Sequence, residues 1–184
     1  AKGKNRTDAA NKLALALQSL HIGGVTTNRD FLVACLRSKH FHKGNTTSDF
    51  IDIAKPKRSI ELSDKEQSLA AIAATLWIQG ENRNNALILK GIQSGWTNSR
   101  LPQQKISFQF NSKEISVEYK SNRDGSFTVN PSINVKVIKW SKFGIDIEIE
   151  ERRFFSKITK KDEKLVVHGP WGDILLTILP RFKT

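Results

Sequence analysis

The ten residues Leu69–Ile78, with the sequence LAAIAATLWI, decide the fold of this chain. Nine of them are apolar, and only Thr75 is polar. A helix of this composition is apolar on all sides and must be covered on all sides. It is too short to cross a bilayer, which takes about 20 apolar residues, so the cover must be protein.

Polar residues on both sides set the length of this helix. Ser63 and Glu66 have the spacing of a capping box, in which the Ser63 hydroxyl accepts the Glu66 backbone N–H and the Glu66 carboxylate accepts the Ser63 N–H. Gly80 and the polar residues 81–85 favour an end. The sequence therefore predicts one apolar helix over residues 63–80.

Downstream, eight short segments alternate apolar and polar residues and are separated by turn signals. The segments span residues 105–110, 115–120, 126–130, 133–140, 145–150, 152–158, 165–168 and 173–178. Regular spacing of about ten residues is typical of an antiparallel sandwich or barrel, and closing a barrel removes exposed strand edges. We therefore predict an α+β fold in which a small helical segment is followed by an eight-stranded antiparallel β-barrel, residues 104–179, around the central apolar helix.

The residues before the apolar helix predict a smaller helical piece, 1–54, joined by a polar linker at 55–62 to a second domain at 63–184. Thr7 is the expected cap of its first helix, which Gly23 and Gly24 end. The apolar residues at helical spacing in that helix are Ala10, Leu13, Leu17 and Leu20. A second helix, capped by Thr27 or Asn28, carries on one side Phe31, Leu32, Cys35 and Leu36.

The formal charge of +12 is spread along the 184 residues. Basic against acidic residues number 11 and 5 in residues 1–62, 4 and 3 in 63–103, and 15 and 10 in 104–184. This spread favours a solvated surface over a nucleic-acid patch. The single cysteine, Cys35, excludes an intramolecular disulfide and indicates a reducing compartment. No signal peptide is recognisable, and since the chain has no initiator Met, we expect that it begins partway through a longer protein.

The sequence contains no Gly-rich phosphate loop, nucleophile elbow or Cys-x-x-Cys pair. Cys35, His40 and His42 match no zinc-binding spacing, and His168 beside a turn favours a structural role. Strand alternation predicts one exposed face for the carboxylates Asp146, Glu148, Glu150 and Glu151. We therefore predict no catalytic, cofactor-binding or metal-binding residue.

One long connection, residues 81–103, is apolar where loops are usually polar. Connections of this length in compact domains are often functional. The apolar residues that either fold back onto the barrel or contact a partner are Leu87, Leu89, Ile92 and Trp96. Asn98 and Arg100 supply a polar edge. An apolar anchor with a polar rim is typical of docking sites, so these six residues are the candidate partner interface.

Two parts of the chain resemble biotin-dependent acyl-CoA carboxylases. Residues 11–17 (NKLALAL) and 22–32 (IGGVTTNRDFL) resemble the C-terminal stretch of biotin carboxylase domains. The pattern continues at Phe41, Gly44, Thr46 and residues 50–52. The BT domain follows biotin carboxylase in these enzymes. The chain is similar to it at Ser94-Gly95-Trp96, Asn98, Gly169-Pro170, Gly172 and residues 180–182 (PRF), whereas Thr97 stands where the family often has Arg.

The resemblance implies that residues 1–54 end a biotin carboxylase domain and that residues 63–184 are a BT domain, an eight-stranded barrel around a long helix. Family members are ligases of fatty acid metabolism that use ATP, Mg²⁺ and bicarbonate to carboxylate biotin, and then pass the carboxyl group to an acyl-CoA. The nucleotide-binding part, the catalytic Glu-Met-Asn-x-Arg motif and the Met-Lys-Met biotinylation site do not occur in this sequence. The resemblance therefore implies a noncatalytic fragment that holds no cofactor itself and connects biotin carboxylase to carboxyltransferase.

The implied partners are a carboxyltransferase subunit or domain, reached through a hook at residues 81–103, and the biotin carboxylase and biotin carrier domains of the same parent chain. The implied location is the bacterial cytoplasm, or the mitochondrial matrix in a eukaryote. An alternative is a β-barrel module that stacks single-stranded nucleic acid on Trp96 or Trp140. The dispersed charge and the lack of an RRM-type aromatic motif argue against it. A free-standing enzyme is disfavoured because no nucleophile, metal or phosphate site can be assembled.

Overall fold

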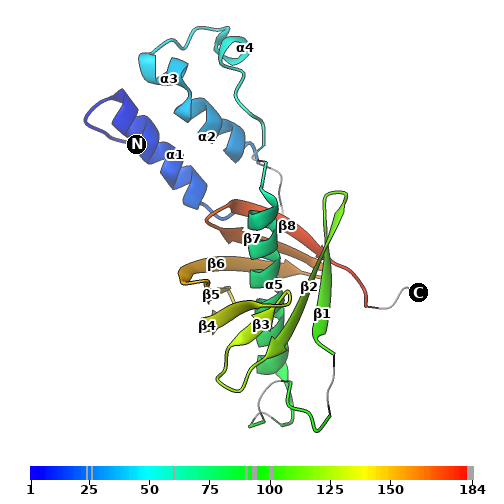
Figure 1. Cartoon of the computed structure of the whole chain (residues 1–184). Coiled ribbons are helices and arrows are strands. Elements are labelled where there is room, and N and C mark those ends of the chain that lie inside the picture. Colours follow the sequence, from blue (N-terminus) through cyan, green and yellow to red (C-terminus); the bar gives the residue numbers. More distant parts are fainter. Residues whose placement is uncertain are drawn as a thin grey trace. The chain divides into compact units, whose positions relative to one another are not determined.

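A computed structural model describes residues 1–23, 25, 27–59, 61–89, 91–92, 95–99 and 102–181 of the chain. These residues form two compact units, Ala1–Leu62 and Ser63–Thr184. The first unit is helical, and the second joins one long helix to eight strands (Figure 1). Helices followed by an antiparallel barrel make this an α+β protein, as the sequence predicts.

Helices make up the regular structure of the first unit. They are α1 (Arg6–Ser19), α2 (Arg29–Arg37), α3 (Lys39–Lys43) and α4 (Phe50–Ala54). The small core of the unit contains Ala10, Ala14, Val33 and Leu36, with Leu17 and Phe41 packed against it. Arg6 ties α1 to α3, because its Nε donates to the Phe41 carbonyl at 2.6 Å and its guanidinium lies 4.5 Å from the centre of the Phe41 ring.

Both ends of α1 differ from the prediction. The N-cap is Asn5 rather than Thr7, since the Asn5 side-chain oxygen accepts the Asp8 backbone N–H at 2.8 Å. The helix stops at Ser19 because Leu20 is already extended. The predicted stop at Gly23 is therefore too late, and Gly24 lies outside the described residues.

The buried faces of α1 and α2 are also narrower than predicted. Leu13 and Leu20 are exposed in or beside α1, where the buried residues are alanines. On the predicted apolar side of α2, Leu32 is exposed, whereas Val33, which the prediction left out, is buried. Asn28 precedes α2 but makes no side-chain capping bond. Each helix buries only the stripe that meets its neighbour, and periodicity cannot choose among adjacent apolar stripes.

The second unit opens with α5 (Asp64–Asn85), which begins with the predicted capping box. Ser63 Oγ accepts the Glu66 N–H at 3.3 Å. The Ser63 hydroxyl and backbone N–H both donate to the Glu66 carboxylate, which holds the pKa of Glu66 below its ordinary value. The predicted end at Gly80 is wrong, because the helix continues to Asn85. Neither α5 nor any other helix in the described ranges is long and apolar enough to cross a bilayer.

The predicted eight strands are confirmed, and they close into an antiparallel barrel in chain order. They are β1 (Gln104–Phe110), β2 (Lys113–Ser121), β3 (Phe127–Val129), β4 (Ile133–Ser141), β5 (Gly144–Ile149), β6 (Arg152–Lys161), β7 (Lys164–Gly169) and β8 (Gly172–Ile178). Closure joins the first strand to the last, with Phe108 opposite Ile178 and the Leu179 N–H donating to the Ser107 carbonyl at 2.9 Å. The barrel therefore has no free first or last strand.

The core of the second unit is formed by alternate residues of the strands together with α5. Fully buried side chains of the strands include Phe108, Val117, Val129, Val135, Ile145, Ile147, Leu165, Val167, Ile174 and Leu176. All residues of α5 from Ala70 to Ile78 are buried, and the helix contacts β2 and each strand from β4 to β8. Ion pairs hold both ends of the helix: Lys113 of β2 bonds Asp64 at 2.6 Å, and Lys160 of β6 bonds Glu81 at 2.7 Å.

Two tryptophans explain why α5 passes through Gly80. A Cβ atom at Gly80 would lie 2.3 Å from Cδ1 and Nε1 of Trp140 in β4. The Trp140 ring is stacked on Trp77, and its Nε1 donates to the Trp77 carbonyl at 3.0 Å. Trp77 Nε1 in turn donates to the Ser141 carbonyl at 2.9 Å. Glycine leaves the space for this ring, so the residue serves close packing and does not end the helix.

Candidate interaction surface

The connection from α5 to β1 carries a run of largely exposed apolar side chains. Leu87 is 95% exposed, and Ile88, Leu89 and Trp96 are each more than half exposed. Within the connection, the Ile92 N–H donates to the Leu89 carbonyl at 3.1 Å. Of the two readings that the sequence leaves open, internal packing is wrong for these side chains, since they face solvent.

The predicted interface residues fall into two groups. Leu87, Leu89 and Ile92 are exposed on the first half of the connection. Trp96 and Asn98 lie farther along, where they line one wall of a groove. Arg100 lies outside the described residues.

The groove has a volume of about 1260 Å³. One wall consists of residues 95–99 and 102–104, and the other of residues 119–123, at the end of β2 and the start of the β2–β3 turn. Gly95 has a φ of 74°, and a Cβ placed there would lie 3.6 Å from the Ser121 Cβ, so the two walls meet at this point. The nearest residues of the two walls along the chain, Gln104 and Tyr119, are 15 positions apart, and the pairing of β1 with β2 brings them together.

The described residues that line the groove carry positive charge only. Lys120 and Arg123 are exposed on the second wall, and no Asp or Glu is among the lining residues. The neighbouring Asp124 is engaged elsewhere, because its carboxylate accepts the Ser126 hydroxyl at 2.7 Å and the Ser126 backbone N–H at 3.0 Å. These bonds hold the pKa of Asp124 below its ordinary value, so it stays ionised beside Ser126.

Sequence reasoning missed Ile88 and the whole second wall of the groove. Ile88 stands within the apolar run and was detectable from its neighbours. Lys120 and Arg123 carry no sequence signal of their own, because their position beside Trp96 depends on strand register. Phe143 and Phe155 are further exposed aromatics on the barrel that the sequence does not mark.

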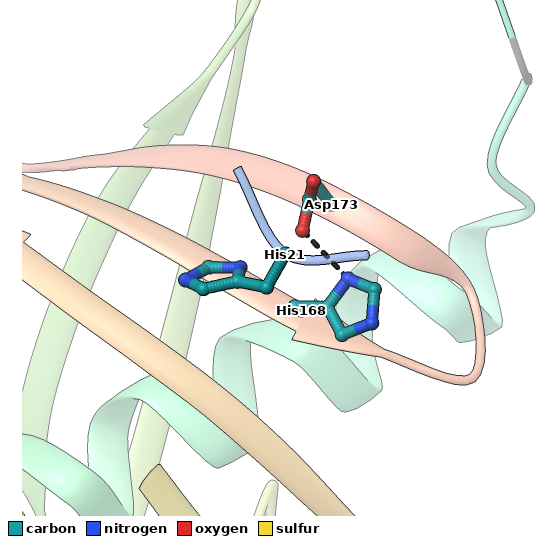
Figure 2. A group of neighbouring side chains, drawn as sticks. All are labelled: His21, His168 and Asp173. Carbon is teal, nitrogen blue, oxygen red and sulfur yellow. Dashed lines mark hydrogen bonds and ion pairs between the residues drawn. The ribbon is translucent and has the colours of Figure 1, made fainter. Parts of the chain in front are cut away.

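His168 and Asp146, two polar residues considered in the sequence analysis, each interact with a side chain on a neighbouring strand. His168 and Asp173 are opposite each other on β7 and β8, and His168 Nδ1 lies 2.7 Å from Asp173 Oδ1 (Figure 2). Asp146 accepts two hydrogen bonds from Arg153 Nε and one from Nη2, at 2.6–3.2 Å. The Arg153 side chain thereby lowers the pKa of Asp146.

Cys35, His40 and His42 do not assemble a metal centre in the part of the chain that the structure describes, because they are not grouped closely enough to share a metal ion. Burial raises the pKa of the Cys35 thiol, which keeps it protonated and poorly nucleophilic. The structure thus directs attention to surfaces of the molecule and away from catalytic chemistry on these residues.

Comparison with known proteins bears on the first unit. Residues 1–53 match the family model of the biotin carboxylase C-terminal domain. The chain is also similar to "Biotin carboxylase 2" of Bacillus subtilis (strain 168), with 38% identity over 50 residues. That alignment covers 27% of this chain and only 11% of the relative. The predicted resemblance of the helical segment to the end of biotin carboxylase is therefore confirmed.

Proposed function

We propose that this chain is a noncatalytic fragment of a biotin-dependent acyl-CoA carboxylase and that it connects biotin carboxylase to carboxyltransferase. The observation that carries the proposal is the match of residues 1–53 to the biotin carboxylase C-terminal domain. A helical unit of this kind, followed in one chain by a barrel with an exposed apolar connection, suits a connector.

The second unit is proposed to be a BT domain. Its support is the combination of a closed eight-stranded barrel with a helix that is buried from Ala70 to Ile78 and contacts β2 and each strand from β4 to β8. We infer from these contacts that α5 runs along the barrel axis. Each element then covers the apolar surface of the other.

The exposed connection is the proposed hook that docks on carboxyltransferase. An exposed apolar run costs solubility and is kept where a partner covers it. Trp96 is the proposed anchor, since tryptophan is enriched among residues that dominate binding energy. Leu87, Leu89 and Ile92 would add apolar contact, and Asn98 and Arg100 a polar rim.

The proposal extends to the parent enzyme. ATP, Mg²⁺ and biotin would be bound by other parts of the parent enzyme. The biotin carboxylase and biotin carrier domains of the parent chain would be further partners. A bacterial cytoplasmic or a mitochondrial matrix location follows from the same proposal.

Binding to carboxyltransferase tests this function. The purified chain should bind the carboxyltransferase subunit of its source organism in a calorimetric titration. Trp96→Ala should weaken this binding by about 2 kcal/mol, which is roughly 30-fold. Its melting temperature should stay nearly unchanged, because the Trp96 side chain is 64% exposed.

Phe143→Ala is the matched control, since Phe143 is an exposed aromatic residue in the β4–β5 turn, outside the connection. It should bind like the wild type. A wild-type chain that does not bind carboxyltransferase would refute the proposed function. Unchanged binding by a folded Trp96→Ala variant would remove Trp96 alone from the interface.

The nucleic-acid alternative gains no specific support. Trp140, one of its two proposed stacking residues, has its ring against Trp77 and its Nε1 bonded to the Trp77 carbonyl. Stacking a base on the face that meets Trp77 would break this contact between helix and barrel.

A further inference from the structure

The groove beside Trp96 has features of a peptide-binding site, and we propose that it binds an extended acidic segment of the partner protein. This proposal rests on the proposed function for the identity of the partner. The chemistry of the segment, however, follows from the groove alone.

Charge selects an acidic occupant. Lys120 and Arg123 are both exposed on one wall, and within the described part of the chain neither has an ion-pair partner. Two unpaired cations and no lining carboxylate would attract Asp or Glu and repel Lys or Arg. The bound segment would therefore place carboxylates near Lys120 and Arg123.

Strand register selects an extended occupant. The last β1–β2 pair is Gln104 with Tyr119, but β2 continues to Ser121. The Asn122 N–H donates to the Ser126 carbonyl, so the backbone N–H and C=O of Asn122 point toward β3. Successive residues of a strand turn these groups to opposite sides, so those of Ser121 point toward the side of β1, beyond the last β1–β2 pair. Pro102 would be next in register there, and proline has no N–H to donate. This short strand edge can pair with an added strand, as in β-augmentation.

Trp96 completes the site on the facing wall. Its side chain is exposed and lines the same groove as Ser121. An extended peptide turns alternate side chains to opposite faces. One set could contact the Trp96 ring while the other set meets the cations.

These features favour a peptide over single-stranded nucleic acid. A nucleic-acid track needs several exposed aromatic rings for successive bases. Among the described residues that line the groove, Trp96 is exposed, but Tyr119 is buried. A strand edge adds hydrogen bonds that a peptide backbone matches and a nucleotide does not.

Fluorescence anisotropy with the full chain tests the proposal. The probes are a fluorescein-labelled (Glu-Val)₄ peptide, a labelled (Lys-Val)₄ peptide and labelled oligo-dT. The acidic peptide should bind at least tenfold more tightly than either other probe. The double variant Lys120→Glu/Arg123→Glu should weaken its binding at least tenfold.

Lys142→Glu/Lys157→Glu is the matched control, with the same change of charge outside the groove. It should change binding less than the groove variant does, at the same salt concentration. Thermal unfolding checks that both variants are folded, and Lys120→Gln/Arg123→Gln replaces the first if it is not. Equal binding of (Glu-Val)₄ by the wild type and the folded groove variant would overturn the proposal, as would tighter binding of (Lys-Val)₄ or oligo-dT.

Acrylamide quenching of tryptophan fluorescence supplies a second measurement. Trp77 and Trp171 are buried and Trp140 is only partly exposed, so quenching reports mainly on Trp96. The acidic peptide should protect against quenching, and Trp96→Phe should remove the protected signal. If the chain binds carboxyltransferase but not (Glu-Val)₄, the groove proposal fails and the proposed function stands. The reverse result would refute the proposed function and leave the groove proposal in place.

Discussion

Gly80 lies inside α5 at a position where the Trp140 ring fills the space that a side chain would need. On an exposed helix, Gly→Ala stabilises by about 1 kcal/mol, because alanine has the higher helix propensity. Here the added methyl group would have to displace a stacked and hydrogen-bonded ring, and overpacking of this kind costs about 1–3 kcal/mol. We therefore expect Gly80→Ala to lower the free energy of unfolding.

Chemical denaturation measures this change, with Gly91→Ala as the control. A Cβ at Gly91 meets no atom within 4 Å, so that variant should unfold like the wild type. A more stable Gly80→Ala variant would mean that the Trp140 ring can move aside at little cost.

Asp146 is the residue for which the structure makes a pH prediction. Hydrogen bonds from Arg153 hold its pKa below the ordinary value of about 3.9. A lowered pKa stabilises the fold above the unfolded-state value, and this contribution is lost as the pH falls through the lower folded-state value. Arg153→Gln should move the pKa of Asp146 upward and reduce stability near neutral pH but not in strong acid.

An NMR titration of the Asp146 carboxyl carbon measures that pKa directly. Arg152→Gln is the control. Arg152 is the adjacent cation, but the hydrogen bonds to the Asp146 carboxylate come from Arg153. The prediction is wrong if the two variants give the same titration curve for Asp146.

At the scale of the element, α5 is the helix on which the barrel core depends. Leu76 is 1% exposed, with its neighbours along the helix buried as well. Leu76→Ala should cost about 2–5 kcal/mol, through lost transfer energy and the cavity left behind. Leu87→Ala makes the same change at a residue that is 95% exposed, and should cost little.

Urea unfolding of the two leucine variants checks this expectation. If Leu76→Ala cost less than about 0.5 kcal/mol, the helix would not behave as core. The inference that α5 runs along the barrel axis would then be wrong.

For the whole molecule, the proposed function predicts that the isolated chain has no bicarbonate-dependent ATPase activity and accepts no biotin. The motifs for both reactions do not occur in its sequence. A coupled assay for ADP release and a biotin-ligase labelling reaction measure the two activities, with an intact biotin carboxylase and a biotin carrier domain as positive controls. Bicarbonate-stimulated ADP release by this chain would contradict the assignment as a connector.

Local patterns were sufficient for much of the fold. The eight strands were predictable because alternation and turn residues act over a few neighbours. The Ser63–Glu66 capping box was predictable for the same reason, since both partners lie within one helical turn. The resemblance of the helical segment to biotin carboxylase likewise depends on contiguous residues, which match over residues 1–53.

Other features depend on residues that are distant in sequence. Gly80 looked like a helix end because Trp140, which occupies its open side, comes 60 residues later. The stripes buried on α1 and α2 were mispredicted because the neighbouring helix, and not the period, selects them. The connection was recognisable in the sequence as an apolar run, but the exposure of its side chains follows only from the three-dimensional structure.

Local sequence features specify the kinds of elements and their order: short helices, one apolar helix and eight strands. These follow from propensity, capping and periodicity, which are local properties. The register of the strands in the closed barrel, and with it the position of Lys120 and Arg123 across a groove from Trp96, became visible only in the folded chain. Closure and register depend on pairing between distant segments, and such pairing is set by the packing of the whole unit.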